Sequence, residues 1–253
     1  MFPLRDENPT EITPYATMAI IAINVVVWLT VQGMGANPPF LHSLCVYGAI
    51  PGGVTGHIPA GARIDFGGYG CRVGGSGWGS VLTSMFMHGG WLHLLGNMWF
   101  LWVFGNNIED SMGHARFVAF YLIAGILASA THILSDPSSA VPVVGASGAI
   151  SGIMGAYLLL YPKVRVQTLV VLIIFIRIFR LPAWVMLGYW FLIQLGSGAA
   201  SGGAQGGVAF WAHVGGFVAG LILIKPFAHR RLVEAKRAGR NLSREEVRDL
   251  GWF

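Results

Sequence analysis

The sequence predicts an all-α membrane protein, a bundle of six transmembrane helices with a long loop after the first. The chain has 253 residues, of which 54% are hydrophobic and 11% are charged. Soluble globular domains carry about 25% charged residues. Apolar runs close to the ~20 residues that cross a ~30 Å hydrocarbon core recur along the whole chain. These observations favour one membrane domain over a large soluble one.

Six apolar runs define the predicted spans. They cover residues 14–31, 81–104, 117–134, 147–161, 183–195 and 208–224. The first run follows three acidic residues, whereas a cleaved signal peptide opens with positive charge, so we expect it to be retained as a span. The chain then divides into an N-terminal segment (1–13), a six-span domain (14–224) and a basic tail (225–253).

One further apolar run, at 169–176, is not counted as a span. Arg177 and Arg180 follow it, and Pro182 prevents a continuous helix into the next run. We expect an interfacial or re-entrant segment here. A longer, kinked fifth helix is the alternative.

Basic residues near the spans indicate the orientation, because cytoplasmic loops are enriched in Lys and Arg. They gather in the connection between the fourth and fifth spans and in the tail: Lys163, Arg165, Arg177, Arg180, Lys225, Arg230, Arg231, Lys236, Arg237, Arg240, Arg244 and Arg248. With six spans, both termini are expected in the cytoplasm, and the loops at 32–80 and 135–145 outside it. The net charge of +5 is then a topology signal, and nucleic-acid binding is not expected.

Both cysteines, Cys45 and Cys71, fall in the long first extracytoplasmic loop. An exterior location permits a disulfide, which would fix a glycine-rich loop. Two free thiols are the alternative.

Polar side chains within or beside the spans are costly to bury in lipid, so each is a candidate functional group. The candidates are His88, His93, Asn97, Glu109, Ser147 and His213. His93 and Asn97 are four residues apart and share one helix face. Simple structural explanations exist: a histidine near a span end reaches the interface, and an asparagine joins helices. Gly216 and Gly220, after His213, are typical of a packing face between helices.

A single chemical hypothesis accounts for the serine, two of the histidines and the asparagine. A serine hydroxyl becomes a nucleophile when a histidine within hydrogen-bond reach takes its proton. His213, on a glycine-lined helix, can approach Ser147 on the small-residue face of the fourth span. N–H groups of His93 and Asn97, with the backbone N–H of Ser147, would hold an oxyanion. No Asp lies inside a span, so we expect a Ser–His dyad, with no metal site and no cofactor.

Three segments resemble the signatures of rhomboid intramembrane serine proteases, in the order of that family. They are "HGGWLHLLGNMWFLWVFG", "GASGAISG" and "AHVGGFVAG". The resemblance implies a six-helix core with Ser147 as nucleophile, His213 as general base, and His93 and Asn97 in the oxyanion hole.

The resemblance also implies supporting roles. It places His88, Gly145, Ala146 and Ser151 beside the active site, and makes Glu109 a structural carboxylate that braces the first loop. Some members carry a tyrosine that stacks on the base histidine where this chain has Ser151, so another group must hold His213 here. Movement near the fifth span would admit substrate, at the face that holds Trp184, Tyr189, Trp190 and Phe191.

The predicted function is an intramembrane serine endopeptidase that cuts in or near transmembrane segments of other membrane proteins. A catalytically inactive relative that binds transmembrane clients is the alternative. A transporter is disfavoured because no second half mirrors the break at Pro182. The expected partners are transmembrane substrates and the lipid bilayer, and the oligomeric state is open. A bacterial inner membrane is the expected location, since the chain shows neither a seventh span nor a transit-like N-terminus.

Overall fold

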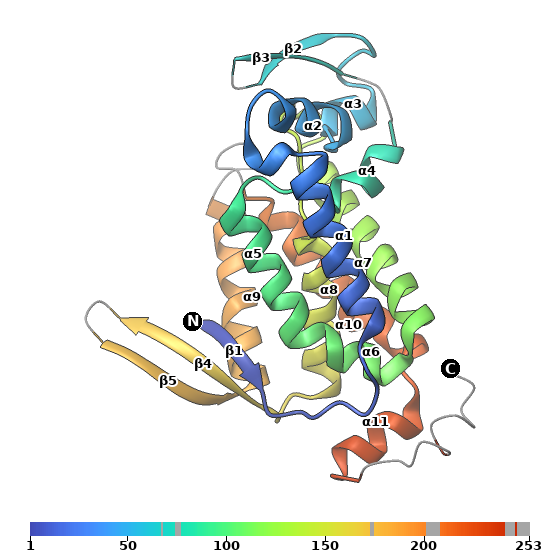
Figure 1. Cartoon of the computed structure of the whole chain (residues 1–253), viewed down its shortest axis with the longest axis vertical. Coiled ribbons are helices and arrows are strands. Elements are labelled where there is room, and N and C mark those ends of the chain that lie inside the picture. Colours follow the sequence, from blue (N-terminus) through green and yellow to red (C-terminus); the bar gives the residue numbers. More distant parts are fainter. Residues whose placement is uncertain (67, 74–76, 173–174, 201–207, 241–245, 247–253) are drawn as a thin grey trace.

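The computed structural model describes the whole chain except residues 67, 74–76, 173–174, 201–207, 241–245 and 247–253. Most of the described residues form helices that run roughly along the long axis of the molecule (Figure 1). The helices are α1 (Tyr15–Thr30), α2 (Pro39–Tyr47), α3 (Pro51–Thr55), α4 (Gly79–Ser84), α5 (Trp91–Phe100), α6 (Asn106–Met112), α7 (His114–Ser135), α8 (Ser147–Leu160), α9 (Ala183–Ala200), α10 (Phe210–Phe227) and α11 (Arg230–Arg237). A short 3₁₀ turn (Gly33–Gly35) follows α1, and a π-helical segment (Leu101–Gly105) joins α5 to α6.

Among the described residues, three helices are long and apolar enough to cross a bilayer: α7, α9 and α10. Helices α1 and α8 are apolar but shorter. Large apolar side chains are exposed along these helices, including Ile23 and Val26 on α1 and Leu192 and Ile193 on α9. Such a surface is typical of helices that contact lipid. The chain is an integral membrane protein, while the full count of six spans stays a prediction.

The predicted second span, at 81–104, is not one helix. Helix α4 ends at Ser84, α5 begins at Trp91, and the backbone between them turns. The side chain of Gln32 fixes this turn from outside: its Oε1 accepts from the His88 backbone N–H, and its Nε2 donates to the His88 carbonyl, each at 2.8 Å. The continuous helical stretch therefore begins ten residues later than predicted and continues through the π-helical segment into α6.

Five strands make the all-α prediction wrong for the parts outside the helical bundle. The strands are β1 (Phe2–Asp6), β2 (Arg63–Phe66), β3 (Tyr69–Arg72), β4 (Arg165–Leu172) and β5 (Phe175–Pro182). Strand β4 pairs antiparallel with both β1 and β5, and β2 pairs with β3. The described residues of the run at 169–176 belong to β4 and β5, so the kinked-helix alternative is wrong. Its β-branched and aromatic residues suit a strand once β1 supplies a partner.

Helices α8 and α10 approach each other backbone to backbone. A Cβ atom on Gly216 would overlap with the Gly148 carbonyl oxygen, and one on Gly220 would overlap with the Gly152 carbonyl oxygen. On the opposite side of the interface, a Cβ on Gly155 would overlap with the Phe217 carbonyl oxygen. Only glycine fits such positions, because any side chain would force the helices apart. The buried core extends from this interface to α1, α5 and α7.

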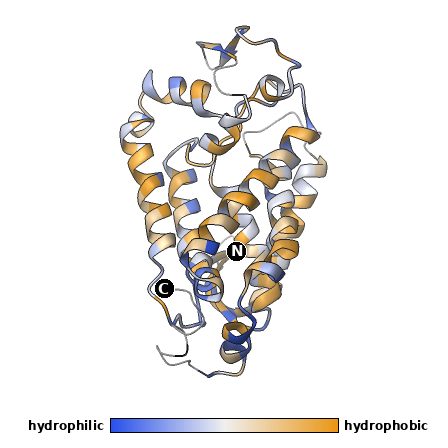
Figure 2. Ribbon diagram, turned by 90° about the vertical axis from the view of Figure 1, so that its right-hand side faces the viewer, coloured by the Kyte–Doolittle hydropathy of each residue, from blue (hydrophilic) through white to orange (hydrophobic). Residues whose placement is uncertain are grey.

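The two ends of the bundle differ in character. At one end, the 32–80 loop carries the Cys45–Cys71 disulfide, and it contacts the 135–145 loop through paired backbone bonds between Ala49 and Val143. At the other end lie β1, the β4–β5 hairpin and α11 (Figure 1). Figure 2 shows apolar residues along the middle of the helices and strongly hydrophilic ones toward the end that holds α11. We call this second end the basic end; Arg244 and Arg248 of the tail lie outside the described residues.

Glu109 lies at the basic end and does not brace the first loop, so that expectation is wrong. Its carboxylate accepts from the backbone N–H groups of Ala16 and Thr17, at 2.9 and 2.7 Å, and from the Thr17 hydroxyl at 2.6 Å. These N–H groups belong to the first turn of α1 and have no intrahelical acceptor. His114 contacts the other side of the same carboxylate. Glu109 therefore joins the start of α1 to the start of α7.

The glycine contacts predict that Gly220→Ala destabilises the fold. The added methyl group has no space against the α8 backbone, and overpacking of this kind costs about 1–3 kcal/mol. Gly188→Ala is the matched control, because a Cβ on that helical glycine meets nothing within 4 Å. The control should be neutral or stabilising by up to about 1 kcal/mol, from helix propensity. Unfolding of the purified variants in detergent measures both, and equal midpoints would contradict the packing described here.

Candidate active site between α8 and α10

Ser147 and His213 are in direct contact. The His213 Nε2 atom lies 2.8 Å from the Ser147 Oγ atom, although the residues are 66 positions apart in the chain. Ser147 is the first residue of α8, and His213 lies in the first turn of α10. The glycine contacts between α8 and α10 bring the two helix starts close enough for this hydrogen bond.

The other ring nitrogen of His213 contacts a third helix. Its Nδ1 atom lies 2.7 Å from the Oε1 atom of Gln194 on α9. Gln194 is only 8% exposed, in a helix that is otherwise apolar around it. Trp190, one turn earlier on α9, lies beside the imidazole with ring centroids 5.7 Å apart and planes inclined by 39°. These two side chains hold His213 in place. They do so without the aromatic ring that position 151, a serine here, cannot supply.

This arrangement fixes the proton positions on His213. An amide oxygen only accepts hydrogen bonds, so Nδ1 carries the proton and donates to Gln194. In the neutral ring Nε2 is then the acceptor, and the Ser147 hydroxyl donates to it. That is the tautomer that a general base for serine requires.

His93 presents an N–H group beside Ser147. Its Nδ1 atom accepts from the Gly89 backbone N–H at 3.2 Å, so the proton of the neutral ring lies on Nε2. A Cβ atom on Gly145 would lie 2.8 Å from His93 Nε2 and 3.5 Å from Ser147 Oγ. Gly145 thus occupies the space between these two groups, with φ +127°. A side chain at this position would be strained and would push His93 away.

Asn97 lies one turn after His93 on α5 and is 8% exposed. Its Nδ2 atom has no hydrogen-bond partner among the described residues. A buried donor left unpaired is costly, and in native proteins it often marks a place where a ligand or water binds. Asn97 therefore offers a second unused N–H group on the helix that carries His93.

Among the described residues, neither Ser151 nor His88 hydrogen-bonds to the Ser147 hydroxyl or the His213 ring. The Ser151 hydroxyl donates to the Ser147 carbonyl oxygen at 2.6 Å, within α8. His88 is fully buried, with its ring 5.2 Å from that of His93. Ala146, also buried, directly precedes Ser147.

A small cavity borders Ser147, whose side chain is half-buried. Its volume is about 10 Å³, and it is lined by Met85, Gly125, Gly145 and Ala212 among others. One water molecule needs about that volume.

Gln194 is the site residue that the sequence interpretation missed. It is the one strongly polar residue in the apolar run at 183–195, and that contrast was a usable signal. The face of α9 that was predicted to admit substrate is only partly exposed. Trp184 and Tyr189 are exposed, whereas Trp190 and Phe191 turn inward onto Phe217 of α10.

The fold and site define an integral membrane protein with a serine and a histidine paired between two closely packed helices. The rhomboid domain family matches residues 75–230, which is more than half of the chain. The chain belongs to the rhomboid family, as the three sequence segments predicted.

Known relatives match parts of the chain. "RHOMBOID-like protein 5" of Arabidopsis thaliana is 38% identical over 78 residues, which are 31% of this chain and 25% of that protein. "Rhomboid protease GluP" of Bacillus subtilis is 35% identical over 154 residues, 60% of this chain and 27% of that protein. "Rhomboid protein 1, mitochondrial" of Saccharomyces cerevisiae is 31% identical over 150 residues, 56% and 40% of the two chains. The matches thus span less than half the length of these relatives.

Proposed function

We propose that this chain is an intramembrane serine endopeptidase that hydrolyses peptide bonds in or near transmembrane segments of other membrane proteins. The observation that carries the proposal is the hydrogen bond between Ser147 Oγ and His213 Nε2, with Gln194 on Nδ1 selecting the tautomer. A half-buried serine needs no such pair for packing alone. Membership of the rhomboid family supports the same reaction class.

In the first step, the Ser147 oxygen attacks the carbonyl carbon of the scissile peptide bond. His213 Nε2 takes the hydroxyl proton as the new C–O bond forms, and the carbonyl electron pair moves onto oxygen. His213 then gives that proton to the amide nitrogen, the C–N bond breaks, and the amine fragment leaves. The product is an ester of Ser147 with the other fragment.

Three N–H groups stabilise the negative oxygen: His93 Nε2–H, Asn97 Nδ2–H and the backbone N–H of Ser147. The last belongs to the start of α8, where helical N–H groups lack intrahelical acceptors and the helix dipole favours negative charge. In the second step, His213 takes a proton from water, which attacks the ester. Collapse of that intermediate releases a carboxylic acid and restores the Ser147 hydroxyl.

Gln194 acts as a positioning residue, since its hydrogen bond within the described part of the chain goes to His213 and not to Ser147. Its neutral oxygen holds the imidazole in place and accepts from Nδ1–H throughout the cycle. A carboxylate would stabilise the protonated ring more strongly, but an ionised group in a membrane helix is costly to bury. An amide provides the acceptor without that cost.

We place substrate access along α9, the helix whose Gln194 contacts His213. Displacement of α9 or of the 135–145 loop would widen the small cavity beside Ser147. The exposed face of α9, with Trp184 and Tyr189, is where a transmembrane segment could lie from the lipid side.

The alternative function is client binding without cleavage, as in an inactive relative. It leaves the Ser147–His213 pair and the unpaired Asn97 donor without a role. A chain selected only for binding has no need to keep this donor set.

We also propose a bacterial inner membrane with both termini in the cytoplasm. The N-terminal and C-terminal elements meet at the basic end: Asp110 accepts from the Glu11 backbone N–H and pairs with Lys236 of α11, at 2.9 and 2.5 Å. Basic ends of this kind remain cytoplasmic. A reporter active only in the cytoplasm should therefore work after residue 253, and one active only outside should work between residues 52 and 66. The reverse pattern would contradict this orientation.

Loss of Ser147 or His213 should abolish cleavage to similar extents. Because the two act as one unit, Ser147→Ala, His213→Ala and the double variant should all fall to the same residual rate. Asn97→Ala should be milder, with a loss on the order of 10- to 1,000-fold, since two oxyanion donors remain. The measurement is cleavage of a panel of transmembrane segments by purified protein, with products mapped by mass spectrometry.

A fluorophosphonate probe separates the two functions. It should label the wild type and the control Ser135→Ala, an exposed serine at the end of α7, and fail to label Ser147→Ala. If folded wild type binds the segments but neither labels nor cuts any of them, the protein is a client binder.

Replacement of Gln194 tests its positioning role. Gln194→Leu removes the acceptor at similar volume, and kcat should fall about 10- to 100-fold with little change in KM, as expected for a supporting partner of a reactive histidine. Gln194→Glu keeps an acceptor oxygen and should restore most of the rate. Gln167→Leu, on β4 at the basic end, serves as the control. Equal kcat values for Gln194→Leu and wild type would exclude the role.

A further inference from the structure

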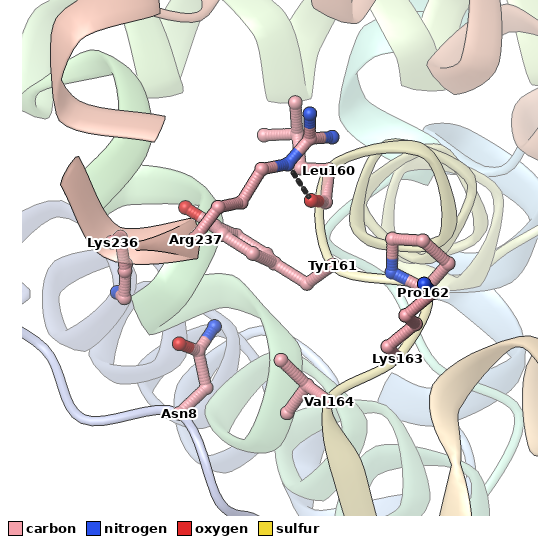
Figure 3. A pocket seen from close by; sticks show the side chains of 8 residues that line it. All are labelled: Asn8, Leu160, Tyr161, Pro162, Lys163, Val164, Lys236 and Arg237. Atoms are coloured by element: carbon pink, nitrogen blue, oxygen red, sulfur yellow. Dashed lines mark hydrogen bonds between the residues drawn. The ribbon is translucent and has the colours of Figure 1, made fainter. Parts of the chain in front are cut away.

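A second cavity lies at the far end of α8 from Ser147. Its volume is about 530 Å³, and it is lined by Asn8, Leu160, Tyr161, Pro162, Lys163, Val164, Lys236 and Arg237. Figure 3 shows these side chains arranged around one space, with Asn8 and Lys236 on one side and Pro162 and Lys163 on the other. The 14 residues of α8 place it roughly 20 Å from Ser147. The cavity plays no part in the reaction proposed above.

One buried hydrogen-bond donor in this cavity is unused. Tyr161 is 3% exposed, and its hydroxyl has no hydrogen-bond partner in the described part of the chain. Asn8 is also buried, but its side chain lies within hydrogen-bond reach of the Tyr157 hydroxyl. Leaving a buried donor unpaired is costly, so the Tyr161 hydroxyl points to an occupant that accepts hydrogen bonds.

Two basic side chains of the cavity, Lys163 and Arg237, form no ion pair among the described residues. Arg237 donates from Nε to the Leu160 carbonyl at 2.8 Å and from Nη2 to the Leu159 carbonyl at 2.9 Å. These carbonyl oxygens orient the guanidinium and offer it only the partial negative charge of a helix end. Lys163 forms no ion pair with any described residue, whereas Lys236 is paired with Asp110. The occupant should therefore be an anion.

The position of the cavity indicates where that anion comes from. It opens where α8 ends at the basic end of a membrane protein, which is the depth of the lipid headgroups on that side. Leu160, Pro162 and Val164 form an apolar part of its wall, which suits a glycerol backbone or the start of an acyl chain. Anionic lipids are attracted to such clusters of Lys and Arg at membrane surfaces.

We propose that this cavity binds the phosphate group of an anionic phospholipid from the leaflet at the basic end. The phosphate oxygens accept from the Tyr161 hydroxyl, and Lys163 and Arg237 balance the charge. Phosphate contacts of this kind are charge-assisted and strong. The site links the N-terminal segment, the end of α8 and α11 through one lipid.

The test is native mass spectrometry of the full chain with equal amounts of phosphatidylglycerol and phosphatidylcholine of matched acyl chains. Wild type should retain phosphatidylglycerol about fivefold or more over phosphatidylcholine, and Tyr161→Phe and Lys163→Gln should each lower that ratio toward one. The matched controls are Tyr121→Phe, a buried tyrosine on α7, and Lys225→Gln, a basic residue on α10 that does not line the cavity. Both controls should keep the wild-type ratio.

A thermal unfolding series identifies the source of the phosphate and checks that the variants fold. Phosphatidylglycerol should raise the unfolding midpoint of wild type and not that of Tyr161→Phe, while inorganic phosphate and glycerol 3-phosphate at millimolar concentration should have no effect. Equal stabilisation by a soluble phosphate would overturn the lipid source. No lipid preference in wild type, or equal losses in pocket and control variants, would overturn the site itself.

Discussion

The contact of α8 with α10 through glycine backbones is the constraint on which the rest of the site depends. With any larger residue at Gly216 or Gly220 the helices separate, because the opposing atoms are main-chain carbonyl oxygens that cannot move aside. A separation of 1 Å would already turn the 2.8 Å contact between Ser147 and His213 into one too long for a good hydrogen bond. The role of glycine at this site is therefore to permit a short distance between α8 and α10. Backbone flexibility is not what the site requires of it.

Helix α9 completes the site from a third direction, and it does so with few contacts of its own. Gln194 and Trp190 both hold His213, while the outer face of α9 is exposed. The same helix therefore orients the base and lies along the proposed path of substrate access. In the proposed mechanism, a displacement of α9 that admits a substrate would also loosen Gln194 from His213, so substrate binding and orientation of the base would be coupled.

The sequence predicted those features that depend on local pattern and missed those that depend on distant partners. Glycine spacing and isolated polar residues within apolar runs were enough to bring Ser147, His213, His93 and Asn97 together as candidates. The β4–β5 hairpin was not predictable as a strand pair from its own residues, because its third strand is β1, more than 150 residues earlier. The break before α5 likewise depends on Gln32, which bonds to both sides of the His88 peptide group from another helix end. Glu109 was recognised as structural, but a lone carboxylate in a sequence does not reveal which helix start it caps.

The basic end shows how the short apolar helix α8 is held at its other terminus. Ser147 begins α8, and Tyr161 follows its last residue, so any tilt of α8 that alters the serine also moves the Tyr161 cavity. The contacts of Arg237 with the last carbonyls of α8 satisfy acceptors that a helix end leaves open, and place positive charge at the negative end of its dipole. Asp110 joins the same α11 to the segment before α1 through Lys236. The orientation of Ser147 is therefore set from both ends of one helix, by glycine contacts near Ser147 and by cationic side chains at the basic end.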